Sequence, residues 1–171
     1  MIFNELKRRH AENIKCHIDY ENNVATFYLH GILSKRLLGY QVYNPNTTNK
    51  KSNDARLSRY FTHQSSFKET GEYAVFGLEY INNRDKLFVT EGIFEASRLI
   101  SLGFDAIAIL TSNPPKNLIT QLFTINKNII WCGDNDKAGK TSRLAQFMHL
   151  YFDRDLDEVD EKTLLSAIER L

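Results

Sequence analysis

The sequence lacks the features that define several classes of protein. Its 171 residues include 2 cysteines, Cys16 and Cys132, which are far apart in sequence and show no short metal-ligand spacing. We therefore expect neither a disulfide framework nor a cysteine-based zinc site. No apolar run approaches the roughly 20 residues that cross a membrane, and the N-terminus has no apolar middle of a signal peptide. These absences favour a cytoplasmic protein with no membrane partner.

An excess of charge of one sign is also missing, because the formal net charge is +1. The charges are nevertheless segregated: residues 35–68 are rich in Lys and Arg, whereas residues 153–161 are strongly acidic. Because neutralisation of phosphates dominates nucleic-acid binding, the basic stretch is the candidate contact region. Its candidate ligands of nucleic acid or nucleotide are Arg56, Arg59 and Lys68. For any one of them, a solvated charged face is an equally good interpretation.

The first half of the chain has the pattern of a small α+β lobe, residues 1–84. Its first 13 residues favour a short amphipathic helix. Short runs of β-branched and aromatic residues then alternate with polar turn formers. The strands expected here cover residues 24–30, 37–43, 56–62 and 72–80. An Asn-rich stretch, residues 44–54, is expected to be a loop.

The second half changes to an alternation of short apolar runs and helical spacing. The expected strands are residues 86–90, 106–110 and 128–131, and the expected helices are residues 93–102, 112–124 and 140–151. Strands that alternate with helices predict parallel βαβ units with right-handed crossovers, hence an α/β fold. We assign residues 85–152 to this domain. Residues 153–171 form a C-terminal acidic segment and a last helix.

Three acidic residues follow two of the expected strands. Glu91 ends the first strand of the α/β domain, and Asp134 and Asp136 follow the third. Ligands of open α/β sheets bind outside the carboxyl ends of the strands. Clustered carboxylates repel one another unless a cation is present, and hard oxygen ligands suit Mg²⁺ or Mn²⁺. Either motif alone is ordinary turn chemistry; both together, one βαβ unit apart, predict a metal site.

Further charged residues lie beside these acids. Lys137 and Lys140 are candidate phosphate contacts, or they balance the local negative charge. Glu95 lies one helical turn after Glu91, where it either faces the site or is a solvated helix residue.

These motifs resemble a known domain. The segments VTEGIFEASRLISLGFDAIAIL and IIWCGDNDKAGK resemble the TOPRIM domain of bacterial and phage primases, topoisomerases and some nucleases. The GDxDKAG form is most similar to primases. Upstream, YQVYNP, RYFTHQSS and AVFGLEYI resemble the lobe that precedes TOPRIM in primases.

The resemblance implies a TOPRIM parallel-sheet core preceded by a small α+β lobe. It also implies a primase-type nucleotidyltransferase that makes short RNA primers on single-stranded DNA from ribonucleoside triphosphates. Divalent metal ions would hold the triphosphate and activate the 3′-hydroxyl, with Glu91 either a metal ligand or a base. A TOPRIM metal-dependent nuclease and a non-catalytic nucleic-acid-binding or regulatory protein derived from a primase are the alternatives. The implied partner is a replication protein, such as a helicase or a zinc-module protein.

The sequence departs from the primase pattern at three places. Thr111 stands where primases usually have a glycine after the second strand. Gly71 stands where the family has a basic residue, with Lys68 nearby. The further acidic pair of many primases has its candidates among residues 153–157.

Overall fold

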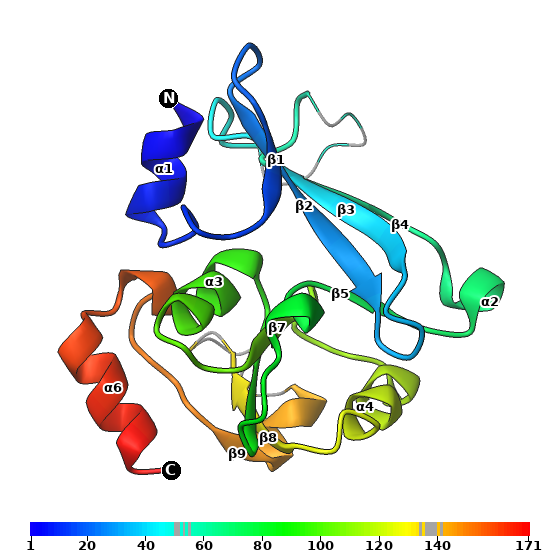
Figure 1. The fold of residues 1–171 in the computed structure, drawn as a ribbon, viewed down its shortest axis with the longest axis vertical. Coiled ribbons are helices and arrows are strands. Elements are labelled where there is room, and N and C mark those ends of the chain that lie inside the picture. Colours follow the sequence, from blue (N-terminus) through cyan, green and yellow to red (C-terminus); the bar gives the residue numbers. More distant parts are fainter. Residues whose placement is uncertain (50–51, 53, 55, 134, 136–139, 141) are drawn as a thin grey trace.

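The computed structural model describes residues 1–49, 52, 54, 56–133, 135, 140 and 142–171. The described chain forms an antiparallel sheet followed by a parallel sheet with helices around it (Figure 1). The α/β fold class and the preceding α+β lobe are therefore confirmed. None of the described helices is long and apolar enough to span a bilayer.

The antiparallel sheet belongs to the N-terminal lobe. Its strands β1 (Cys16–Asp19), β2 (Val24–Gly31), β3 (Leu37–Tyr43) and β4 (Tyr60–Gln64) lie in this order, and β5 (Ala74–Val75) pairs with β2. Helix α1 (Ile2–Arg8) buries Ile2 and Leu6 against one face of the sheet. Helix α2 (Phe67–Thr70) is a single turn that begins with a capping box between Ser66 and Glu69.

The end of the lobe differs from the sequence prediction. The strand expected over residues 72–80 is the short β5 followed by a 3₁₀ turn, Leu78–Tyr80. The reason is Gly77, whose φ of 95° ends the extended backbone. A Cβ at Gly77 would lie 2.6 Å from the carbonyl oxygen of Ala106, so the close approach of the two sheets requires a glycine here. Similarly, the strand expected at residue 56 begins only at Tyr60.

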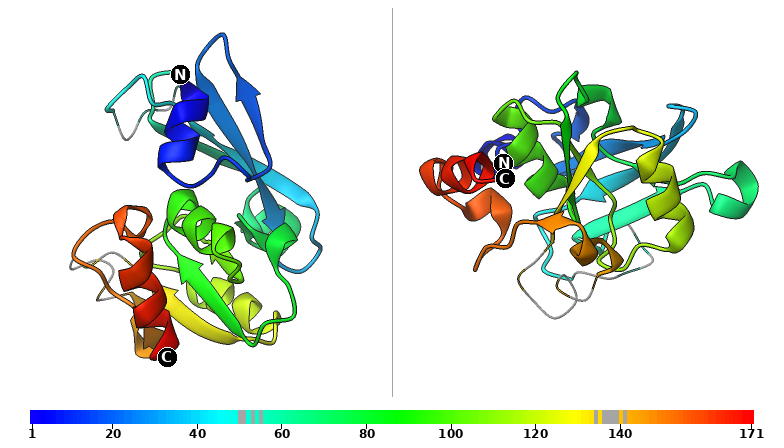
Figure 2. Two further views of the ribbon diagram at one scale, coloured as in Figure 1. Left: turned by 60° about the vertical axis from the view of Figure 1, so that its left-hand side comes forward. Right: turned by 90° about the horizontal axis from the view of Figure 1, so that it is seen from below.

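The parallel sheet has the strand order β7-β6-β8-β9. Strands β6 (Lys86–Thr90), β7 (Ala106–Ala108) and β8 (Asn128–Cys132) appear where the sequence predicted them. Helices α3 (Ile93–Ser101) and α4 (Lys116–Phe123) connect them and lie on opposite faces of the sheet (Figures 1 and 2). These are the parallel βαβ units that the alternating pattern indicated.

The helix expected over residues 140–151 is wrong for most of that range. Arg143–Gln146 is a 3₁₀ turn, and Met148–His149 forms β9, which pairs in parallel with β8. The local sequence favours a helix, but hydrogen bonding to the open edge of β8 outweighs that preference. The chain then passes through a second 3₁₀ turn, Leu156–Glu158, to helix α6 (Glu161–Glu169), which Asp160 caps.

The two sheets share a continuous core. Phe27 of β2 makes edge-to-face contacts with Phe76 and Phe94, whose ring centroids lie 5.9 and 5.8 Å away. Along β6, Phe88 packs into the cluster on the α3 side, whereas Leu87 and Val89 pack into the cluster on the α4 side. This period of two is that of a strand buried on both faces. The shared core holds the N-terminal sheet over the carboxyl ends of the parallel strands.

Candidate metal and nucleic-acid site

A cleft of about 680 Å³ lies between the N-terminal lobe and the carboxyl ends of the parallel strands. Both halves of the chain contribute to its wall. The lining side chains from the lobe are Arg8, Arg9, Gln41, Arg59 and Tyr60. Those from the second half include Glu91, Glu95, Thr111, Ser112, Asp155 and Glu158. The cleft therefore joins basic groups of the lobe to acidic groups of the α/β domain.

Glu91 lies where the sequence predicted it, directly after β6 at the cleft. Its carbonyl oxygen accepts a hydrogen bond from the backbone N–H of Leu110, at 2.9 Å. Leu110 has φ of 58°, a left-handed conformation that a leucine rarely adopts. The strained turn after β7 is therefore bonded to the backbone of Glu91, immediately before Thr111, the position where primases usually have a glycine.

Three residues predicted at the site, Asp134, Asp136 and Lys137, lie outside the described residues, and Lys140 is exposed. Two described contacts are made by residues that lie next to these in sequence, Cys132 and Asn135. Thr90 pairs with Cys132, so the chain leaves β6 and β8 at the same edge of the sheet. In addition, Asn135 Nδ2 donates a hydrogen bond of 2.7 Å to Asp153, at the start of the acidic C-terminal segment.

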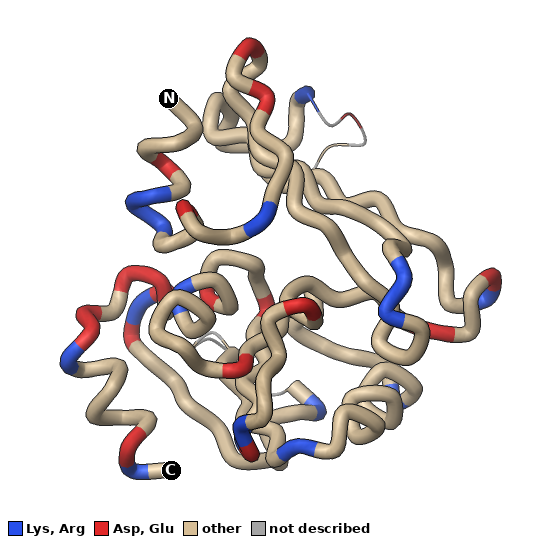
Figure 3. Tube along the Cα trace, in the orientation of Figure 1, with Lys and Arg blue, Asp and Glu red and all other residues tan. Residues whose placement is uncertain are grey.

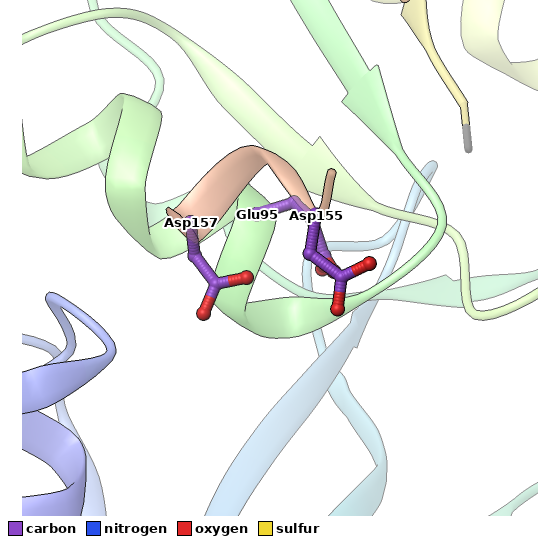
Figure 4. Close-up of side chains that lie close together, drawn as sticks. All are labelled: Glu95, Asp155 and Asp157. Carbon is purple, nitrogen blue, oxygen red and sulfur yellow. The ribbon is translucent and has the colours of Figure 1, made fainter. Parts of the chain in front are cut away.

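A group of three carboxylates lies at the cleft: Glu95 and Asp155 line it, and Asp157 is buried beside them. Glu95 of α3 and Asp155 and Asp157 of the acidic segment each place one carboxylate oxygen within 4.8 Å of the other two (Figure 4). Asp157 is buried and Asp155 is exposed. The triad includes Glu95, for which the sequence left two interpretations, and two residues of the range 153–157. Three hard oxygen ligands at this spacing fit a divalent cation such as Mg²⁺.

Arg9 ties the triad to the N-terminal lobe. Its Nε and Nη2 donate to the two carboxylate oxygens of Asp157 at 2.7 and 3.1 Å, and its Nη1 donates to the hydroxyl of Tyr60 at 2.8 Å. The guanidinium also lies over the ring of Phe94, 3.9 Å from the centroid. Burial lowers the pKa of Arg9, but the hydrogen bonds and charge of Asp157 outweigh burial and raise it well above its ordinary value. Arg9 is therefore a permanent cation beside the triad. Figure 3 shows the basic end of α1 close to the acidic C-terminal segment.

Sequence reasoning did not find Arg9, because nothing in the local pattern separates it from Arg8. Both arginines line the cleft, but Arg8 pairs with Glu5 and its side chain is 54% exposed, whereas Arg9 pairs with Asp157 and its side chain is 8% exposed. Only the position of α1 against the acidic segment distinguishes these neighbours.

The three predicted basic residues of the lobe do not lie together. Arg59 lines the cleft, and its guanidinium carbon lies 6.0 Å from the ring centroids of both Tyr43 and Tyr60. Arg56 is highly exposed and pairs with Asp54 at 2.7 Å. Lys68 lies on α2, at the far end of the lobe. Of the three, Arg59 is the residue that the described structure brings to the acidic site.

No protein-family model matches the chain, and no curated protein matches it. Several solved structures are similar to it. A DnaG catalytic core has a TM-score of 0.62 and 20% identity over 86% of this chain. A DnaG primase catalytic domain bound to single-stranded DNA has a TM-score of 0.63 and 19% identity over 98% of it. The primase fragment of the bacteriophage T7 primase-helicase has a TM-score of 0.61 and 15% identity over 86% of it.

The chain therefore has the fold of a primase catalytic core, with a TOPRIM-type parallel sheet and the lobe that precedes it. More particularly, its similarity to DnaG catalytic cores extends over most of its length. The chain spans 52% of the DnaG catalytic core, 56% of the domain bound to single-stranded DNA and 62% of the T7 primase fragment, which is little more than half the length of the structures that it matches.

Proposed function

We propose that the chain is the core of a primase-like nucleotidyltransferase that makes short RNA primers on single-stranded DNA with divalent metal ions. The observation that carries the proposal is the carboxylate triad of Glu95, Asp155 and Asp157 at a cleft in a primase-type fold. The sequence prediction adds Glu91, Asp134 and Asp136 to this proposed acidic site; of these, Glu91 is among the described residues and lines the cleft.

The proposed metal site fits the donor set. Carboxylate oxygens on two separate segments leave room for the waters and substrate phosphates that Mg²⁺ keeps in its coordination shell. When bound, such ions would lower the charge of the triphosphate and favour ionisation of the attacking hydroxyl. The chain's own residues would then position the substrates: Glu95, Asp155 and Asp157 orient the cation, and Arg59 faces them across the cleft to contact phosphate.

Arg9 has a positioning role in this proposal. It holds both oxygens of Asp157 from one side, which fixes the direction in which the remaining lone pairs point. It also reduces the repulsion among three carboxylates when the cation is absent. Pre-organisation of this kind keeps a metal site in shape between catalytic cycles.

The test is extension of a short RNA primer annealed to single-stranded DNA, with ribonucleoside triphosphates and Mg²⁺. Glu95→Gln keeps the shape of the side chain but loses its charge, and it should reduce extension at least tenfold while leaving the melting temperature unchanged. The matched control is Glu21→Gln, in the exposed turn between β1 and β2, which should extend normally. Extension by Glu95→Gln at the wild-type rate would rule out the triad as the metal site.

The same assay separates the alternatives. Cleavage of the labelled strand without extension would favour a TOPRIM nuclease, and binding alone would favour a regulatory protein. We also propose that a replication partner, such as a helicase or a zinc-module protein, supplies template selection. The similar structures include the zinc-binding and RNA polymerase domains of Aquifex aeolicus primase and a phage primase-helicase. We expect extension of a pre-annealed dinucleotide to exceed de novo initiation, because initiation must also bring two nucleotides together.

A further inference from the structure

The outer face of the N-terminal sheet carries a row of exposed aromatic side chains. Tyr28 of β2 is paired directly with Tyr40 of β3, which is paired in turn with His63 of β4. Residues that face each other across strands project on the same side of a sheet. We call Tyr28, Tyr40 and His63 the aromatic row; it crosses three strands, or about 10 Å at the usual strand spacing.

This face is the one turned away from the lobe's core. Phe27 and Tyr43, which alternate with row residues along β2 and β3, are at most 1% exposed, whereas Tyr28 and Tyr40 are each 37% exposed. The rings of Tyr40 and His63 lie alongside each other, with centroids 5.4 Å apart and planes 36° apart. The helices of the described chain lie on the other face or beyond the ends of these strands (Figure 2). The rings of Tyr40 and His63 therefore support each other at the surface.

The three strands of the row carry no acidic side chain that would repel an anionic partner, and two basic residues lie in the adjoining turn. Strands β2, β3 and β4 contain no Asp, Glu, Lys or Arg in any position. Lys35 and Arg36 lie in the turn that joins β2 to β3, at the ends of the strands that carry Tyr28 and Tyr40 and so beside the row. Figure 3 shows this basic turn at the end of the two strands. Glu72 lies under that turn and accepts hydrogen bonds from the backbone N–H groups of Leu33 and Ser34.

The row is also continuous with the proposed active site. A second cleft, of about 520 Å³, is lined by Thr62, His63 and Gln64 of β4 and by Leu110 and Thr111. Leu110 and Thr111 line the first cleft as well. A strand that leaves the acidic site across Thr111 therefore runs along β4, an edge strand, and meets the row at His63.

We propose that single-stranded DNA leaves the cleft over the edge of β4 and stacks its bases on the aromatic row. Aromatic side chains on a sheet stack bases without regard to sequence, because every base has a π face. The choice of DNA as the occupant rests on the proposed function; the row itself is a separate binding surface from the acidic site. Lys35 and Arg36 would neutralise phosphates of the strand beside the row.

The experiment measures binding of labelled thymidine oligonucleotides to the full chain by fluorescence anisotropy, in EDTA so that metal plays no part. A strand of about 30 nucleotides reaches the row, whereas one of about 6 is held within the clefts. Tyr40→Ala should weaken binding of the long strand about 5-fold to 100-fold and leave the short strand unchanged. Tyr40→Phe keeps the ring and should bind as the wild type does.

Tyr20→Ala is the matched control, because Tyr20 is a 69% exposed tyrosine in the same lobe but off the row. Equal long-strand affinity for Tyr40→Ala, Tyr20→Ala and the wild type would overturn the row proposal, and normal primer extension by the same samples would show that the proposed function stands. Conversely, weaker binding by Tyr40→Ala in a chain that extends nothing would support the row and count against the proposed function. A dimer that Tyr40→Ala dissociates, with DNA affinity unchanged, would assign the row to self-association and refute DNA stacking.

Discussion

Replacing Arg9 by methionine tests how the acidic triad is held against the lobe. The Arg9–Asp157 pair is almost completely buried, with exposed side-chain fractions of 8% and 1%. Methionine fills most of the same volume and keeps a favourable contact with the ring of Phe94. It removes the charge and all three side-chain hydrogen bonds that Arg9 donates to Asp157 and Tyr60.

The expected loss in the free energy of unfolding follows from the Asp157 carboxylate, which Arg9→Met leaves buried without its partner. Breaking a buried pair costs about 3–5 kcal/mol, mainly because the remaining charge is buried without compensation. The neighbouring pair is a matched control: Arg8 and Glu5 are also 2.7 Å apart, but their side chains are 54% and 22% exposed. An exposed pair contributes about 0–1 kcal/mol. Arg9→Met should therefore lower the free energy of unfolding several times more than Arg8→Met.

The assay is urea unfolding of both variants in EDTA, since a bound cation would compensate for the missing arginine. A double variant, Arg9→Met with Asp157→Leu, should recover most of the stability, because an apolar pair of similar volume replaces a buried ion pair at little cost. A loss below about 1 kcal/mol for Arg9→Met, equal to that of Arg8→Met, would refute the reasoning. Arg9 would then be solvated in solution rather than part of the site.

Three other predictions follow from the described contacts. A residue other than glycine at a positive φ costs about 1–2 kcal/mol. In urea unfolding, Gly71→Ala should lose only this amount, because its Cβ meets nothing within 4 Å, whereas Gly77→Ala should lose more, because its Cβ would lie 2.6 Å from a carbonyl oxygen. Hydrogen bonding to a neighbouring arginine lowers the pKa of Glu5 from 4.5 to about 2. The stability that the charge of Glu5 provides is therefore complete above pH 4.5 and is lost as the pH falls towards 2. The difference in the free energy of unfolding between the wild type and Glu5→Gln should shrink over that pH range. Arg59→Gln should reduce the salt dependence of single-strand binding by up to about one unit of slope, and an equal effect of Arg56→Gln would contradict the assignment of Arg59 to the cleft.

Local pattern was sufficient for much of the fold. The apolar runs that became β6, β7 and β8 are short, buried on both faces and separated by helical spacing, so their place in a parallel sheet can be predicted from periodicity. The position of Glu91 follows from the same argument, because the residue after a parallel strand lies at the carboxyl edge of the sheet. Residues of this kind are determined by their neighbours in sequence.

Contacts between distant segments decided the rest. Strand β9 forms because β8 leaves an edge unpaired, and the local residues alone favoured a helix. The triad depends on Glu95 and Asp157, which are 62 positions apart in sequence and meet only when the acidic segment packs beside α3. Arg9 reaches that segment across 148 positions. Periodicity shows which face of an element is buried, but the packing of the whole chain determines which partner covers that face. The sequence therefore predicted the edge of the sheet at which the site lies, whereas the tertiary structure determined which charged residues meet there.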